Sequence, residues 1–146
     1  MLTTLSISNY ALIKELQTDF TKGLSIITGE TGAGKSIVLG ALGLVMGNRA
    51  DLNSLKDNSK KCVIEATFSV GAYQLKEFFE DKDLDYEEEA LIRREILPSG
   101  KSRAFVNDTP VTLSILNVFY KLSIVCYSWL TNQNYLLRHP KFETGS

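Results

Sequence analysis

The feature that most constrains this chain is an eight-residue pattern near its amino terminus, Gly29-Glu30-Thr31-Gly32-Ala33-Gly34-Lys35-Ser36. The pattern satisfies G-x-x-x-x-G-K-[ST], in which the glycines let backbone N–H groups converge on phosphate oxygens. The apolar segment 24–28 precedes it and predicts a short strand. Apolar residues spaced three and four apart follow Gly34 and predict a helix. A strand, this loop and a helix in direct succession predict a phosphate-binding unit inside an α/β fold.

The residues of the pattern have complementary chemical roles. Lys35 can reach the β- and γ-phosphates of a nucleotide as a point charge, and the hydroxyl of Ser36 can ligate Mg²⁺. The helix directs the positive end of its dipole at the phosphates. We therefore expect a nucleotide and Mg²⁺ as cofactors, with Ser36 as the metal ligand. The expected cofactor-binding residues are Gly29, Glu30, Thr31, Gly32, Ala33, Gly34, Lys35, Ser36 and Ile37.

The groups that hydrolysis requires do not accompany this loop. Hydrolysis also needs an acidic residue at the end of a second strand, which holds Mg²⁺, and a group that orients water. After residue 44, no run of four apolar residues is followed by Asp or Glu, and an L-S-G-G signature is absent. We therefore assign no catalytic residue and expect the chain alone to have no turnover.

The rest of the chain predicts an antiparallel β portion. Apolar and polar residues alternate in several segments, as in half-buried strands, and Thr112 is a good N-cap for a helix that extends to Leu122. Asn9-Tyr10 is expected to form a turn, and residues 47–61 are expected to form a polar loop. The expected strands lie around 2–7 and at 13–20, 62–70, 91–97, 102–106 and 123–127, and a short helix lies at 73–80.

Composition adds limits on the class of protein. The chain has 146 residues, a formal net charge of −1 and two cysteines, so bulk charge gives no case for nucleic-acid binding. The acidic run 80–89 is expected to be a solvated turn or helix end. The longest strongly apolar run, 37–47, is too short to span a bilayer, so a cytoplasmic protein without membrane contact is expected. The basic residues Arg93, Arg94, Lys101 and Arg103 form either a solvated hairpin face or a phosphate-contacting patch.

Several segments together resemble the amino-terminal part of the RecN family of bacterial DNA-repair ATPases, which are related to the SMC proteins. The resemblance extends collinearly from residue 1 to about residue 122. The phosphate loop is shared by many ATPases, whereas the segments 9–13 and 100–105 are more particular to RecN. The matching segments are 5–13, 29–37, 47–51, 91–96, 100–108 and 110–113.

The resemblance implies a P-loop, ABC-type ATPase head with a mixed sheet, of which residues 1–122 form an amino-terminal part. It implies ATP as the nucleotide, and a function in DNA double-strand break repair and recombination after DNA damage. The missing hydrolytic groups would lie in the carboxy-terminal half of the same head. Further implied partners are a second head, in an ATP-dependent dimer, and DNA in the full-length protein, which would be nucleoid-associated.

The resemblance weakens after residue 122. The family has an Asp-x-His-x-Gln-His segment there, whose glutamine belongs to the Q-loop, but this chain lacks the Asp and the His. Gln133 is the nearest glutamine and is not assigned to that role. Residues 123–146 are therefore interpreted as a divergent Q-loop region and a truncated carboxy-terminal end.

Four residues outside the loop carry alternative interpretations. Tyr10 either stacks on adenine or packs in the core. Arg49 either approaches ATP or DNA, or is an ordinary surface arginine. His139 is expected to be solvated, and Trp129 to pack in the core or cap the truncated edge.

Two other functions remain open. A stand-alone small P-loop kinase would use Arg93, Arg94 and Arg103 in a lid over its substrate. The third possibility is a nucleotide-binding interaction module without ATPase activity.

Overall fold

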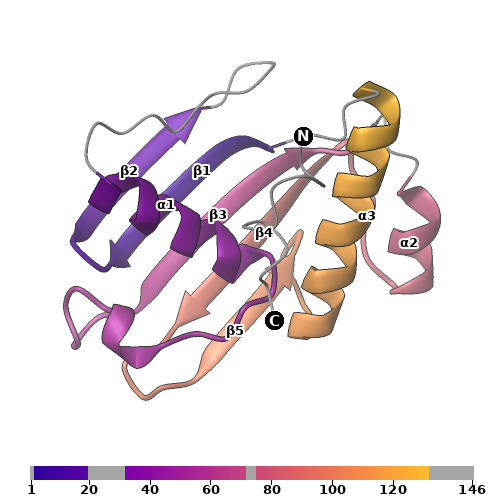
Figure 1. Ribbon diagram of the computed structural model, residues 1–146. Coiled ribbons are helices and arrows are strands. Elements are labelled where there is room, and N and C mark those ends of the chain that lie inside the picture. The colour runs from indigo at the N-terminus through magenta and orange to yellow at the C-terminus, as the bar shows by residue number, and fades with distance from the viewer. Residues whose placement is uncertain (1, 20–31, 72–74, 132–146) are drawn as a thin grey trace.

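The computed structural model describes residues 2–19, 32–71 and 75–131, without the side chains of 32–36, 52 and 123–131. The described part of the chain combines strands and helices in one fold, with the helices placed between runs of one to three strands and at the end (Figure 1). Their bounds are β1 Leu2–Tyr10, β2 Ile13–Asp19, α1 Gly32–Val45, η1 Leu52–Ser54, β3 Cys62–Ser69, α2 Lys76–Asp81, β4 Glu89–Ile96, β5 Ser102–Val106, β6 Thr109–Pro110 and α3 Leu113–Thr131.

The described strands form one sheet in the order β2-β1-β3-β4-β5-β6. All its pairings are antiparallel, which confirms the expected antiparallel portion. The strand predicted at 24–28, which a mixed sheet would require, lies outside the described residues.

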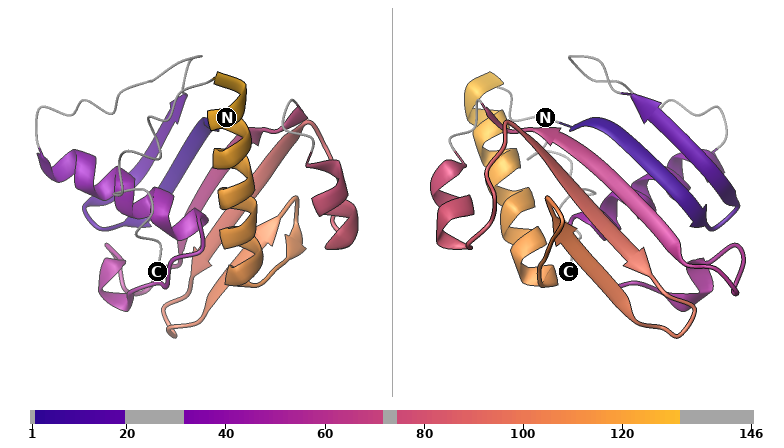
Figure 2. Two further views of the ribbon diagram at one scale, coloured as in Figure 1. Left: turned by 45° about the vertical axis from the view of Figure 1, so that its right-hand side comes forward. Right: turned by 180° about the vertical axis from the view of Figure 1, so that it is seen from behind.

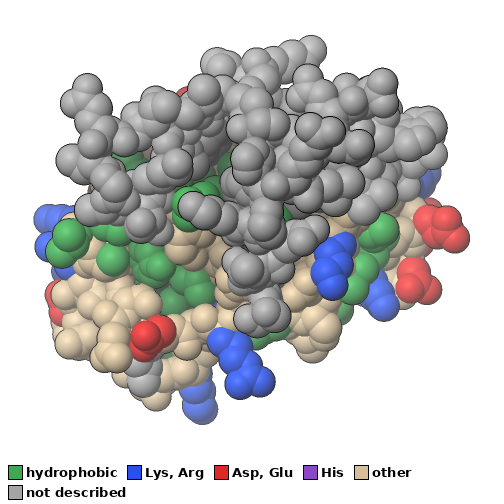
Figure 3. All heavy atoms as spheres, viewed as in Figure 1, with side chains coloured by type: hydrophobic (Ala, Val, Ile, Leu, Met, Phe, Trp, Pro, Cys, Tyr) green, Lys and Arg blue, Asp and Glu red, His purple; other side chains and the backbone are tan. Residues whose placement is uncertain are grey.

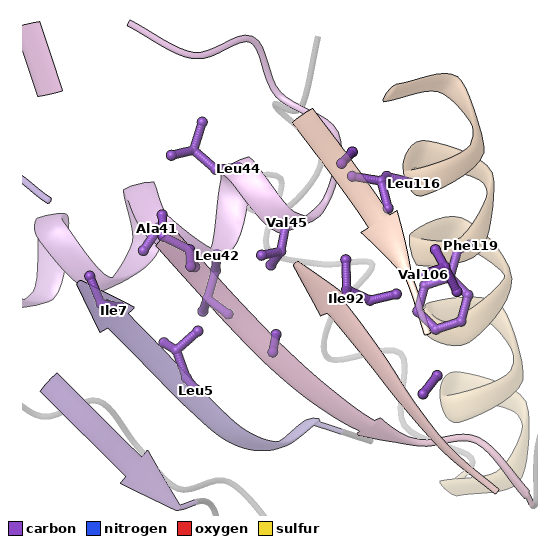
Figure 4. Close-up of a cluster of buried hydrophobic side chains, with 14 of the residues drawn as sticks. Leu5, Ile7, Ala41, Leu42, Leu44, Val45, Ile92, Val106, Leu116 and Phe119 are labelled. Carbon is purple, nitrogen blue, oxygen red and sulfur yellow. The ribbon is translucent and has the colours of Figure 1, made fainter. Parts of the chain in front are cut away.

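One face of this sheet carries the helices. Seen from behind, the sheet lies in front of both α1 and α3 (Figure 2). The hydrophobic core lies between these helices and the sheet, where Leu42 of α1 lies near Leu5 of β1, and Phe119 of α3 lies beside Val106 of β5 (Figure 4). This arrangement follows from the alternation of apolar residues in the strands, because alternate side chains point to the same face. Within the described residues, no helix has the length and hydropathy needed to cross a membrane.

One turn and one helix differ from the sequence-based expectations. Strand β1 continues through Tyr10, and the turn falls at residues 11 and 12 instead of at Asn9-Tyr10. Thr112 does cap α3, because its Oγ1 accepts from the N–H of Ile115 at 3.4 Å. The strand expected at 123–127 is wrong, because α3 continues through these residues to Thr131. Helix α3 thus crosses the boundary predicted at residues 122 and 123, and that division of the chain stays a prediction.

The polar loop 47–61 is fastened to β1 by the buried side chain of Asn9. Its Nδ2 donates to the carbonyls of Asp57 at 3.0 Å and Lys60 at 2.9 Å, and its Oδ1 accepts from the N–H of Asp57 at 2.7 Å. Asn9 adopts a left-handed φ of 57°, a conformation that asparagine tolerates better than most residues. The loop therefore has a defined path along the end of β1.

The acidic run 80–89 forms the end of α2 and the connection to β4, and most of its side chains are exposed, as expected. Two of its residues face inward: Leu84 is buried and Tyr86 packs edge-on against Phe79 at 5.5 Å between ring centroids. The ring of Phe79 also packs edge-on against the ring of Phe119 of α3, with 6.1 Å between the ring centroids. The aromatic cluster thus fastens α2 to α3, on the side of α3 away from α1 (Figure 1).

Candidate nucleotide-binding site

The start of α1 lies inside the G-x-x-x-x-G-K-S pattern. The helix begins at Gly32, so the backbone of residues 32–36 forms its first turns. The first four N–H groups of any helix have no partner within it and point along the positive end of the helix dipole. Gly29, Glu30 and Thr31 lie outside the described residues, and the side chains of Lys35 and Ser36 are not described. The described backbone therefore fits a phosphate group at the amino end of α1.

The body of α1 is fixed against the sheet by its apolar face. Ala41, Leu42 and Val45 are buried in the core, and Ile37 is half-buried. Burial of such side chains contributes about 1.5–3 kcal/mol for each large one. The helix is therefore held along its length, so the position of its first turn depends on the packing behind it.

Gly40 and Gly43 of α1 both allow close approach of a neighbouring side chain, but only Gly40 does so against the sheet. A Cβ at Gly40 would lie 2.5 Å from the hydroxyl oxygen of Tyr10 on β1. A Cβ at Gly43 would instead meet the amide nitrogen of Asn48 at 2.6 Å, within the helix's own carboxy-terminal turn. Tyr10 is half-buried against the core, and burial raises the pKa of its hydroxyl. The core-packing interpretation of Tyr10 is confirmed, and stacking on adenine stays a prediction.

The carboxy end of α1 is closed by a Schellman motif. The N–H of Asn48 donates to the carbonyl of Gly43 at 3.0 Å, and that of Gly47 to the carbonyl of Leu44 at 3.3 Å. Gly47 has a left-handed φ of 106°, as the residue after a helix often does. A Cβ at Gly47 would meet the carbonyl oxygen of Leu113 at 2.7 Å, so α1 ends directly against the first turn of α3.

Arg94 of β4 donates hydrogen bonds to this end of α1 from the sheet. Its Nη1 donates to the carbonyls of Leu44 at 2.7 Å and Asn48 at 2.8 Å, and its Nη2 donates to the hydroxyl of Ser102 at 3.1 Å. The side chain is fully buried, and burial lowers the pKa of the guanidinium. A cation at the carboxy end of a helix also interacts favourably with the negative end of the dipole. Arg94 therefore links α1 to the middle of the sheet.

The predicted cluster of basic side chains does not exist as one surface. Arg94 points to the helix-covered face, whereas Arg93 points to the opposite face, where its guanidinium lies 4.4 Å from the ring centroid of Phe105. Arg93 also forms two ion pairs, one between its Nη1 and Oδ1 of Asp108 at 3.2 Å and one between its Nε and Oε2 of Glu95 at 3.6 Å. Arg103 lies 3.8 Å from the same Glu95 carboxylate. The solvated hairpin face and its alternative, a phosphate-contacting patch, are therefore both wrong for Arg94, which is buried, because successive residues of a strand face opposite sides of the sheet.

The sequence did carry a signal for the position of Arg94. Ala90, Ile92, Arg94 and Ile96 alternate along β4, and all four are buried on one face. An arginine in register with three apolar residues is expected to face the core.

The remaining predicted residues lie at the surface or outside the described part. Arg49 is exposed just after α1, which fits the surface alternative, and its approach to ATP or DNA stays a prediction. The backbone of Trp129 lies in α3, but its side chain is not described. Gln133 and His139 lie outside the described residues.

The comparison with protein families decides the class of the chain. A model of the AAA domain matches residues 4–126, which include the G-x-x-x-x-G-K-S pattern, α1 and all of the described sheet except the first two residues of β1. The chain belongs to the AAA domain family.

This AAA domain is similar in sequence to the "DNA repair protein RecN" of Vibrio cholerae, with 39% identity over 144 residues, 98% of this chain and 26% of that protein. It is 42% identical over 120 residues to the "DNA repair protein RecN" of Haemophilus influenzae, which covers 80% of this chain and 22% of that protein. The predicted resemblance to the amino-terminal part of RecN is therefore confirmed, and the AAA domain spans about a quarter of the length of these relatives.

Solved structures agree on the fold. The AAA domain superposes with a TM-score of 0.62 and 22% identity on a chain from a study of "ATP-driven dimerization and DNA stimulated activation of SMC ATPases". The superposition covers 84% of this chain and 79% of that chain. The expected fold class, the amino-terminal lobe of a P-loop, ABC-type ATPase head, is confirmed.

Proposed function

We propose that this chain is the ATP-binding, amino-terminal part of a RecN-like ATPase head that acts in DNA double-strand break repair and recombination. The observation that carries the proposal is the start of α1 at Gly32, inside the G-x-x-x-x-G-K-S pattern. This start offers phosphate oxygens several backbone donors and the positive end of a dipole. A structural relative comes from a study of ATP-driven dimerization of SMC ATPases, which supports ATP as the nucleotide.

Within this proposal, residues 29–37 hold the phosphates. Lys35 contacts the β- and γ-phosphates, Ser36 ligates Mg²⁺, and the remaining residues contribute backbone amides. The metal ion would neutralise part of the phosphate charge once the nucleotide is bound. The part of the chain from β3 to β5 supports α1 from the sheet and does not itself contact the nucleotide.

The proposed role extends to partners that complete the ATPase. The sequence lacks an acidic strand end after residue 44 and an L-S-G-G signature, so hydrolysis depends on the carboxy-terminal half of the head. The structural relative comes from a study of ATP-driven dimerization of SMC ATPases, which supports a second head as the other partner. We assign DNA contact, cytoplasmic location and nucleoid association to the complete protein. Among the described side chains on the helix-bearing face, Lys and Arg stand apart from one another instead of forming a broad basic surface (Figure 3).

The alternative of a stand-alone kinase is less well supported. A lid needs arginines that can reach a bound phosphate, but Arg94 is buried at the end of α1. Arg93 is paired with Asp108 and Glu95 on the opposite face. The arginines proposed for a lid are thus engaged in other contacts.

Calorimetric titration with Mg-ATP, combined with a turnover assay, tests the proposal. The wild-type chain is expected to bind Mg-ATP without measurable turnover, and Lys35→Ala is expected to abolish binding, because it removes the charge on the β- and γ-phosphates. Asp108→Ala, far from α1, provides a surface control with unchanged affinity. Equal affinity in the wild type and Lys35→Ala would contradict the proposal, and phosphoryl transfer to a nucleoside monophosphate would favour the kinase.

A further inference from the structure

Arg94 is a buried cation whose described partners are oxygen atoms of neutral groups. It donates to two carbonyls at the end of α1 and to the Ser102 hydroxyl. Among the described residues, it forms no ion pair with a carboxylate; the buried Glu95 beside it contacts Lys61, Arg93 and Arg103 on the opposite face. The charge of Arg94 is therefore compensated mainly by the carboxy end of α1.

A side chain that only filled this space would not need a charge. Burial of a cation has a large desolvation cost, and well-packed apolar residues of similar volume often replace buried charges without loss of stability. What an arginine adds is direction, because its planar guanidinium fixes several acceptors in one geometry. The acceptors here are the carbonyls of Leu44, in the last turn of α1, and Asn48, in the Schellman motif. Arg94 thus specifies where the end of α1 lies relative to β4 and β5.

The other end of the same helix carries the phosphate-binding pattern. Helix α1 has 14 residues from Gly32 to Val45, and a helix rises about 1.5 Å per residue, so it extends on the order of 20 Å. A displacement at one end of so short a rigid helix is transmitted to the other. Binding groups have to stay within about 0.5 Å of their productive positions to keep their effect. The position of the amides near Gly32 therefore depends on the contacts at Leu44 and Asn48.

We infer that Arg94 is a positioning residue for ATP binding: from the sheet, it holds the carboxy end of α1 and so sets the position of the phosphate-binding amides at the amino end. This inference rests on the proposed function. Arg94 touches no nucleotide in this account and acts only through the helix.

The decisive variant is Arg94→Met, which keeps an unbranched apolar stem and removes the guanidinium donors. Two measurements are needed. Hydrogen exchange reports on the backbone amides of residues 37–45 in α1, with those of β3 as the internal reference. Calorimetry then gives the dissociation constant for Mg-ATP. We expect exchange in α1 to accelerate more than exchange in β3, and the dissociation constant to rise by about tenfold or more.

Two control variants separate positioning from a general loss of stability. Arg93→Met makes the same change at the neighbouring residue, whose contacts lie on the opposite face of the sheet. Phe79→Leu weakens the aromatic cluster that joins α2 and α3 away from α1. Both controls are expected to leave the dissociation constant within about twofold of the wild type, as sites without shared partners behave independently. Arg94→Lys keeps the charge but loses the fork geometry, so it should give an intermediate affinity.

The outcomes distinguish this inference from the function on which it rests. A wild-type chain that does not bind Mg-ATP overturns the proposed function and the positioning role together. Normal wild-type binding with an unchanged affinity in Arg94→Met overturns the positioning role alone. The positioning role alone is also overturned if Arg94→Met loses no more affinity than Phe79→Leu when both variants show the same fall in melting temperature. Should Arg94→Met fail to fold, the same comparison is made with Arg94→Lys.

Discussion

At the scale of single residues, Cys62 provides a test of how tightly the region around Arg94 is packed. Its side chain is fully buried, and burial raises the pKa of the thiol from about 9 to about 11, against an opposing effect of Arg94. A pKa raised by folding means that the folded state holds the proton more tightly than the unfolded state. The stabilisation is therefore complete below pH 9 and is lost as the pH rises toward 11.

Cys62→Ala should remove this pH dependence. We expect the free energy of unfolding of the wild type, relative to that of Cys62→Ala, to fall by up to about 2–3 kcal/mol between pH 9 and pH 11. Urea unfolding at a series of pH values measures this difference, and the other titrating groups, which both proteins share, cancel. A difference that does not change with pH would show that Cys62 is open to water in the folded chain.

The residue scale also shows what the sequence could reveal and what it could not. The alternation along β4 places Arg94 on the buried face, but it does not say which acceptors the guanidinium meets. Those acceptors, Leu44 and Asn48, lie 50 and 46 residues away in the sequence. The partners of Asn9 could not be predicted either, because Asp57 and Lys60 come close to it only when the loop 47–61 returns along β1. Long-range polar contacts of this kind depend on tertiary packing and leave no periodic signal.

At the scale of secondary-structure elements, the junction between α1 and α3 depends on a glycine. Gly47→Ala would force a left-handed φ on an alanine and place its Cβ 2.7 Å from the carbonyl oxygen of Leu113. We expect this variant to lose more than about 2 kcal/mol of unfolding free energy, because strain and steric overlap act together. Urea denaturation measures the loss.

Gly71→Ala is the matched control for this junction. Its Cβ would lie 3.4 Å from the flexible side chain of Glu88, an ordinary contact, so a change within about 0.5 kcal/mol is expected. If Gly47→Ala were tolerated as well as Gly71→Ala, the close contact between α1 and α3 would be contradicted.

The elements themselves were predicted unevenly. Strands β3, β4 and β5 follow from alternation, and the hairpin between β4 and β5 from Pro98 and Gly100, whose φ of 95° suits a glycine. The segment 123–127 was predicted to be a strand because a short apolar run has no periodicity that separates a strand from a buried helix. In the structure it simply continues the helix that Thr112 begins.

At the scale of the whole molecule, the chain spans about a quarter of the length of the RecN proteins it matches, and we propose that it is one lobe of an ATPase head. The phosphate loop was recognisable from sequence because its glycines, lysine and serine have fixed spacing. The groups that would complete the site could not be located, because this sequence has no acidic strand end after residue 44 and no L-S-G-G signature. We therefore propose nucleotide binding for this lobe and hydrolysis for a complete head.

The most direct test of this account is backbone-amide NMR of the chain titrated with Mg-ATP, with Lys35→Ala as the comparison. The account predicts that the largest shift changes fall in residues 29–37, with smaller ones along α1, and that Lys35→Ala suppresses them at the same nucleotide concentration. Chemical-shift changes that fall outside residues 29–37, or that are the same in Lys35→Ala, would contradict the assignment of ATP to this loop.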